Sequence, residues 1–300
     1  MSGATTSSHP PAAIGQVELE EWFADHGRDL PWRRTRDPWA IVVAELMLQQ
    51  TQVDRVVDRW TRFLQRFPTV AACAAAPAAD LIDEWAGLGY NRRALYLHRM
   101  AITVVEEHGG RFPTGLTALL ALPGVGPYTA RAIRVFADEQ PDAVVDTNVA
   151  RILARTEGRS LSLREAQVAA DSAVDRTGRD PWAWNQALLD VGAGWCRAKA
   201  PRCGSCPLRD RCHWFDAGNP EPDPAQGSGG VSGRQSRFEG SDRQGRGRLI
   251  DALRSGPVTT PDLAAVMGWP DDPGRACRVA DGVVADGLAV RTADRLSLPR

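Results

Sequence analysis

The chain has 300 residues, enough to bury a sizeable core in one large domain or in two or three smaller ones. A hydrophobic fraction of 43% and a net charge of −1 are typical of a globular protein and exclude one that is basic throughout, although a local basic surface for nucleic acid stays open. No apolar run reaches the roughly 20 residues that a membrane helix needs, and the polar N-terminus carries no export signal. We therefore expect a cytoplasmic protein without a membrane partner.

The predicted elements follow one another in a simple order. Residues 1–17 are small and polar, and we expect them to be disordered. Over 18–216, apolar residues recur at helical spacing between Gly and Pro breaks, which predicts an all-α domain. Residues 217–240 are rich in Gly, Pro, Ser and Asp and predict a flexible linker. Three helical segments and an alternating segment at 288–298 predict a winged-helix-like module over 241–300.

Two acidic residues stand out among apolar neighbours. Glu45 is the single charge in the helical run from Trp39 to Val53. It either faces solvent or is buried, and burial would favour the protonated carboxyl that a general acid needs. Asp146 lies at the start of a later helical segment, where it could be only an N-cap.

A glycine-containing turn separates two helical segments. Leu-Pro-Gly-Val-Gly at 122–126 includes Gly124 and Gly126, which allow a tight turn to present backbone N–H groups at a helix start. Such a turn is a natural anion site, and an ordinary interhelical turn is the alternative.

Four of the six cysteines lie in one short segment: Cys196, Cys203, Cys206 and Cys212. In a chain without an export signal, this grouping predicts a metal or cluster site rather than disulfides. Four thiolates suit either zinc or an iron–sulfur cluster, and the spacing alone does not decide between the two. Basic residues in the same segment could contact DNA phosphates or could simply be solvated.

Together these motifs resemble the endonuclease III superfamily of DNA glycosylases. The cysteine spacing is similar to its [4Fe–4S] loop, and residues 122–126 are similar to its helix–hairpin–helix motif, which grips the DNA backbone without reading sequence. The segment Glu-Leu-Met-Leu-Gln-Gln-Thr-Gln-Val at 45–53 resembles the MutY family of adenine DNA glycosylases. Further matches to that family are Arg-Asp-Leu-Pro-Trp-Arg at 28–33, Gly-Leu-Gly-Tyr at 87–90 and Trp-Asn-Gln-Ala at 184–187.

The resemblance implies a two-lobed all-α fold and a catalytic role for individual residues. Glu45 would protonate the flipped adenine and help to position water, and Asp146 would stabilise the oxocarbenium-like sugar. Tyr128 and Asn148 would help to position these groups. Endonuclease III has a lysine nucleophile where this chain has Tyr128, and Lys199 is the only lysine present. The comparison therefore predicts a monofunctional glycosylase without efficient lyase activity.

The resemblance also implies contacts with double-stranded DNA that contains a mismatched adenine. Gln50 and Tyr90 would wedge into the base stack and fill the hole that the flipped base leaves. The residues similar to those lining the adenine pocket, for which core packing is an equal alternative, are Arg28, Trp32, Leu48 and Gln186.

The C-terminal part of the chain departs from the family pattern. Most MutY relatives carry a Nudix-like domain there, whereas this chain has the winged-helix-like module. That module could contact DNA through 276–284 and a hairpin with Arg291 and Arg295, or it could be a packing or protein-contact module.

We therefore expect a monomeric adenine DNA glycosylase that holds a [4Fe–4S] cluster and acts on adenine opposite 8-oxoguanine or guanine. A thymine–guanine mismatch glycosylase of the same superfamily is one alternative. A non-catalytic iron–sulfur protein that binds DNA or senses redox state is another.

Overall fold

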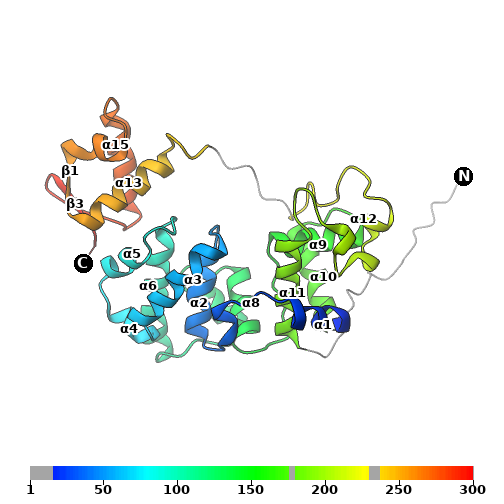
Figure 1. The fold of residues 1–300 in the computed structure, drawn as a ribbon. Helices are drawn as coiled ribbons and strands as arrows, with labels where there is room; N and C mark the ends of the chain where they lie inside the picture. The colour runs from blue at the N-terminus through cyan, green and yellow to red at the C-terminus, as the bar shows by residue number, and fades with distance from the viewer. Residues whose placement is uncertain (1–15, 176–179, 230–236, 300) are drawn as a thin grey trace, which may run out of the picture. The chain divides into compact units, whose positions relative to one another are not determined.

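The computed structural model describes residues 16–175, 180–229 and 237–299 (Figure 1). The expected disordered N-terminus, apart from Gln16 and Val17, lies outside these residues. The helices are α1 (Gln16–His26), α2 (Pro38–Leu48), α3 (Val53–Arg66), α4 (Val70–Ala75), α5 (Ala78–Glu84), α6 (Arg92–His108), α7 (Leu116–Ala121), α8 (Pro127–Phe136), α9 (Thr147–Glu157), α10 (Leu163–Asp175), α11 (Pro181–Gly194), α12 (His213–Asp216), α13 (Asp242–Ser255), α14 (Leu263–Met267) and α15 (Pro273–Ala285). None of these described helices is long and apolar enough to span a bilayer.

The chain folds into two compact units, and each is built from segments that are distant in sequence. The first unit combines residues 1–33 with 130–233, and the second combines 34–129 with 234–300. The helical region expected at 18–216 is thus shared between the units. This division agrees with the two-lobed all-α fold that the resemblance implies.

The core of the first unit is built around α9 and α11. Val149, Ile152, Trp184 and Leu188 are buried there. Helix α1 packs against α11, which lies far along the chain. Asp180 begins α11 by accepting a hydrogen bond from the Trp182 backbone N–H at 2.9 Å, as expected of an Asp-Pro start.

The segment expected to be a flexible linker is packed over its first half. Asp223 forms an ion pair with Arg155 at 2.6 Å, and both side chains are buried. The Gly229 backbone N–H donates to the Leu161 carbonyl at 3.2 Å. These contacts depend on a buried arginine, a partner that the polar, proline-rich composition of the segment does not reveal. Residues 230–236 lie outside the described part.

Helix α2 runs through the core of the second unit. Asp37 caps its start by accepting from the Trp39 N–H at 3.0 Å, and every residue from Trp39 to Met47 is buried. A helix that is apolar on all sides is stable only when other elements surround it completely. The indole of Trp60 on α3 donates to the Ala40 carbonyl at 2.8 Å and fixes one neighbour of α2.

The C-terminal part of the second unit contains the three helices and the hairpin predicted for it. Helices α13, α14 and α15 accompany strands β1 (Val258–Thr259), β2 (Val290–Thr292) and β3 (Arg295–Ser297). These strands form an antiparallel sheet in the order β1-β3-β2. We call residues 242–299 the C-terminal module. Its arrangement corresponds to the winged-helix pattern.

Candidate active site and cysteine loop

Glu45 is buried within the second unit. It lies on the last part of α2 and is only 6% exposed, as one of the two sequence alternatives predicts. Leu48, at the end of the same helix, is half-buried, and Gln50 is exposed just beyond it. The rigid, enclosed helix therefore holds the one acidic side chain of its apolar run away from bulk water.

Asp146 caps α9 in the first unit and belongs to a chain of hydrogen bonds. Its Oδ1 accepts from the Val149 backbone N–H at 2.8 Å, and its Oδ2 accepts from Asn148 Nδ2 at 2.8 Å. Asn148 Oδ1 in turn accepts from Arg151 Nη2 at 2.7 Å, and Arg151 Nε donates to the Cys196 carbonyl at 2.6 Å. Asp146 therefore caps α9 with one carboxylate oxygen, while Asn148 orients the other oxygen.

The surroundings of Asp146 act on its charge in opposite directions. Burial raises the pKa of its carboxyl above the ordinary value, while the hydrogen bonds from Val149 and Asn148 oppose the rise. A carboxylate in this position has little water around it. Its negative charge is therefore weakly screened and can stabilise a positive charge that forms close to it.

The four clustered cysteines form one half-buried loop in the first unit, which we call the cysteine loop (residues 196–212). Two short 3₁₀ turns, Cys203–Ser205 and Arg209–Arg211, shape it. Arg155 Nη1 donates to Cys196 Sγ at 3.4 Å, and Cys212 Sγ donates to the Arg155 carbonyl at 3.4 Å. The loop is thus fastened to α9 at its first and last cysteines.

Four thiol side chains in one loop are a donor set that suits a metal ion or a metal cluster. The pKa of Cys206 is raised to about 12, mainly by burial and also by the negative charge that the other three cysteines carry as thiolates. The four sulfurs are therefore close enough to repel one another as anions, and they need a positive group to be held as thiolates. Among the described residues, no three His, Cys, Asp or Glu side chains are arranged to hold a metal ion.

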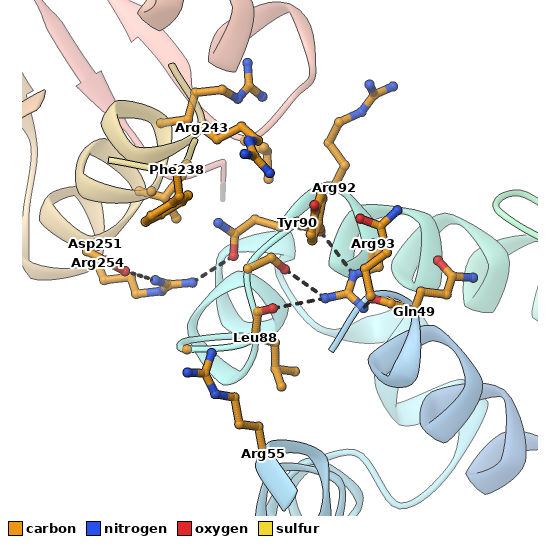
Figure 2. Close-up of a pocket in the computed structure, with 18 of the residues that line it drawn as sticks. Gln49, Arg55, Leu88, Tyr90, Arg92, Arg93, Phe238, Arg243, Asp251 and Arg254 are labelled. Atoms are coloured by element: carbon orange, nitrogen blue, oxygen red, sulfur yellow. Dashed lines mark hydrogen bonds and ion pairs between the residues drawn. The ribbon is translucent and has the colours of Figure 1, made fainter. Parts of the chain in front are cut away.

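Two exposed side chains lie on adjacent strained turns in the second unit. Gln50 has a φ of 55° and Tyr90 a φ of 46°, a left-handed conformation that non-glycine residues rarely adopt. Such strain persists only where the surroundings impose it, and it is common at functional sites. The buried side chain of Arg93 connects the two turns (Figure 2).

Arg93 is a functional candidate that the sequence analysis missed. Its guanidinium donates to carbonyls at the end of α2 and in both strained turns, and also to one hydroxyl. The acceptors are the carbonyls of Leu46, Met47, Gln49, Leu88, Gly89 and Tyr90 and the hydroxyl of Thr51. Burial lowers its pKa to about 10, so it remains a cation at neutral pH. In sequence, Arg93 is indistinguishable from the exposed Arg92 beside it.

The glycine-containing turn lies in the second unit, between α7 and the start of α8. Gly124 has a φ of +77°, and a Cβ there would lie 2.6 Å from the Tyr96 Cβ. A Cβ on Gly126 would meet nothing within 4 Å. The first glycine is thus required by the fold, while the second leaves open backbone beside the half-buried Tyr128 at the start of α8.

Three of the expected pocket residues lie in the first unit. Trp32 and Gln186 are buried, and Arg28 Nε donates to Asp190 Oδ1 at 2.7 Å. Arg33 donates to both oxygens of the same carboxylate, at 2.8 and 2.7 Å. Burial works to raise the pKa of Asp190, but the two arginines outweigh it and hold the pKa below its ordinary value. Asp190 is therefore a fixed anion that orients Arg28, and no sequence motif pointed to it.

The predicted site residues thus form local groups in each unit. The first unit holds Asp146 with Asn148, the Arg28–Asp190 pair and the cysteine loop. The second holds Glu45, Leu48 and Tyr128, together with the two turns that Arg93 joins.

Comparison with known proteins gives a consistent family. Residues 43–172 match the HhH-GPD superfamily of base excision DNA repair proteins. The chain is 41% identical to the adenine DNA glycosylase of Mycolicibacterium smegmatis over 294 residues, covering 94% of each chain. It is also 41% identical to that of Mycobacterium tuberculosis, covering 96% of this chain and 95% of the relative. The similarity is long enough to extend into the C-terminal module.

Among solved structures, the chain is similar to a thermostable thymine-DNA glycosylase. The TM-score is 0.63 at 28% sequence identity, and the match covers 67% of this chain and 94% of the other. This likeness is weaker in sequence than the match to the two mycobacterial enzymes.

Proposed function

The chain belongs to the adenine DNA glycosylase family of the HhH-GPD superfamily, and we propose that it hydrolytically removes adenine mispaired with 8-oxoguanine or guanine in double-stranded DNA. The observation that carries this proposal is 41% identity with an adenine DNA glycosylase over 94% of both chains. It is supported by a buried acid, Glu45, on the helix whose sequence resembles the MutY family.

In this proposal the two acidic residues perform different parts of one hydrolysis. Glu45 protonates the flipped adenine, which is the role that the resemblance to the MutY family gives to this buried acid. Loss of the base leaves positive charge on the sugar, which the Asp146 carboxylate stabilises. Asn148 fixes the direction of that carboxylate through its 2.8 Å hydrogen bond, and Tyr128 helps to orient Glu45.

The remaining predicted residues would hold the DNA. Gln50 and Tyr90, on their strained turns, are proposed to enter the base stack where the adenine leaves it. The backbone N–H groups at Gly124 and Gly126 would donate hydrogen bonds to phosphate oxygens at the start of α8. The adenine would contact the pocket residues Arg28, Trp32, Leu48 and Gln186.

The cysteine loop is proposed to hold a [4Fe–4S] cluster through Cys196, Cys203, Cys206 and Cys212. When bound, the cluster supplies the cationic iron that keeps four adjacent thiolates together and so cross-links the loop. The loop presents basic side chains at its surface for DNA phosphates.

The proposal includes hydrolysis without strand cleavage. A lyase reaction requires an amine that attacks the sugar, and Tyr128 occupies the position of the endonuclease III lysine. Borohydride treatment during turnover is therefore expected to leave no protein–DNA adduct. A stable adduct on Lys199, the only lysine, would contradict this part of the proposal.

A duplex assay at fixed salt tests the substrate. We expect excision from duplexes with A:8-oxoguanine and A:G, and none from T:G. Glu45→Gln should slow excision by about 10²–10⁴-fold, and Asp146→Asn by about 10²–10³-fold. Matched controls are Glu84→Gln, another buried acid of the second unit, and Asp180→Asn, another N-cap of the first unit.

The same assay separates the competing functions. Excision of thymine from T:G without loss of adenine would favour the thymine-specific alternative, in line with the likeness to a thymine-DNA glycosylase. Full excision by the Glu45 and Asp146 variants would remove the catalytic assignment. Duplex binding without excision of any base by the wild type would favour a non-catalytic DNA-binding protein.

A further inference from the structure

The C-terminal module is fixed to the helices that precede it in the second unit. Ile82 of α5 and Leu95 of α6 share a buried core with Leu249, Leu253 and other module residues. Arg254 Nη2 donates to the Ile82 carbonyl at 2.9 Å and to Asn91 Oδ1 at 3.2 Å. Because both apolar and polar groups join across this contact, α13 is held in a defined position beside the Tyr90 turn.

One face of α13 lines a groove of about 890 Å³ in the second unit (Figure 2). Arg243, Gly247, Ile250 and Arg254 follow one another at helical spacing and all line it. The opposite side is formed by the end of α2, the start of α3 and the turn that carries Tyr90. A Cβ placed on Gly247 would have no heavy atom within 4 Å, so no side chain fills the middle of the groove at this point.

The groove is strongly basic although the chain as a whole has a net charge of −1. Its charged lining residues are Arg55, Arg92, Arg93, Arg243, Arg246, Arg254 and Asp251. The single lining carboxylate, Asp251, is paired with Arg254. Just outside the lining, Asp286 bridges Arg92 and Arg246 and so fixes one arginine of α6 beside one of α13. Such a concentration of guanidinium groups attracts phosphate oxygens, which arginine binds with two donors.

Exposed aromatic rings accompany the arginines. Tyr90 is 44% exposed and Phe238 57% exposed, and the Arg243 guanidinium lies 5.8 Å from the Phe238 ring centre. Basic side chains combined with accessible aromatic faces are the pattern of nucleic-acid grooves. The groove also includes Gln50, the other residue proposed to enter the base stack.

We propose that this groove binds the sugar–phosphate backbone of DNA beside the flipped adenine, and that α13 of the C-terminal module supplies part of the contact through Arg243. The module then contacts DNA through α13 rather than through α15 and the β2–β3 hairpin. Arg291 of that hairpin forms an ion pair with Asp281 at 2.6 Å, and this carboxylate competes with phosphates for the guanidinium. This inference about the groove depends on the proposed function only because that function places DNA at Gln50 and Tyr90.

Binding of an undamaged, fluorescein-labelled duplex by the full-length chain tests the proposal. Arg243→Gln changes the module side of the groove, and Arg55→Gln changes the exposed opposite side. Arg295→Gln is the matched control, because it removes an exposed arginine from the hairpin of the same module. The dissociation constant is measured over a series of salt concentrations, and unchanged melting temperatures confirm that each variant is folded.

We expect several-fold weaker binding by Arg243→Gln and by Arg55→Gln, with a salt dependence that is shallower by about 0.9 for each phosphate that the variant no longer neutralises. Arg295→Gln should bind like the wild type. Wild-type affinity and salt dependence of Arg243→Gln would overturn the proposal, whether or not Arg55→Gln or Arg295→Gln is weakened. Undamaged DNA needs no excision, so a different base specificity would not affect this result.

Discussion

Replacing Arg93 by Met tests whether one buried cation holds both strained turns. The change keeps an unbranched side chain but removes the donors from three buried carbonyls, those of Leu46, Met47 and Leu88. An unsatisfied buried acceptor costs about 1–3 kcal/mol. The low end applies because removing a buried cation recovers desolvation energy, which its lowered pKa reflects. The sum is about 3 kcal/mol, or a melting temperature lower by roughly 6–12 °C.

Thermal and urea unfolding of the full chain measure this loss. The adjacent Arg92→Gln is the control, since its 54% exposed side chain should change stability by less than about 0.5 kcal/mol. At a temperature where Arg93→Met is fully folded, excision should still be slower than in the wild type, because Gln50 and Tyr90 are no longer fixed. A stability loss below about 1 kcal/mol, with unchanged excision, would refute the reasoning.

Three further predictions concern Asp146, the cysteine loop and the glycine-containing turn. Burial raises the pKa of Asp146, and its carboxylate is the active form, so on acidification the excision rate should begin to fall at a higher pH than it would with an ordinary aspartate of pKa about 3.9. The folded state binds this proton more tightly than the unfolded state, so Asp146→Asn should be as stable as the wild type or more stable at pH 7. That difference in stability should vanish as the pH falls through the raised pKa. Cys212→Ser should lose bound iron and sulfide and lower the melting temperature, whereas Cys277→Ser, outside the loop, should retain both, as elemental analysis would reveal. Gly124→Ala should lower the free energy of unfolding by more than about 2 kcal/mol, because it places a Cβ at a left-handed φ and against Tyr96. Gly126→Ala should leave the stability unchanged in the absence of DNA and should change only duplex binding. Equal losses in the two glycine variants would contradict the steric argument.

The local elements were largely predictable from the sequence because their signals are local. Helical periodicity and Gly–Pro breaks predicted an all-α region, and the structure is helical there. The unbroken apolar run around Glu45 left two alternatives, and the structure confirmed burial. The N-cap at Asp146 was predicted correctly, since capping depends only on residues within one turn.

The contacts that organise the site could not be predicted in the same way. Arg93 and Arg151 are ordinary helix residues in sequence, and their roles depend on carbonyls that distant segments bring to them. The segment at 220–229 was expected to be flexible because composition does not show Arg155, the partner that binds Asp223.

The sequence by itself determined the chemistry available to this protein: two acids in apolar surroundings, a glycine turn and four cysteines with a family-like spacing. These signals are carried by residue types at fixed short separations, so they survive without coordinates. Only the tertiary structure decided that the C-terminal module packs on α5 and α6 and that its arginines share a groove with Tyr90. A charge gains meaning from its neighbours in space, and those neighbours are brought together by burial of apolar surface that is far apart in the chain.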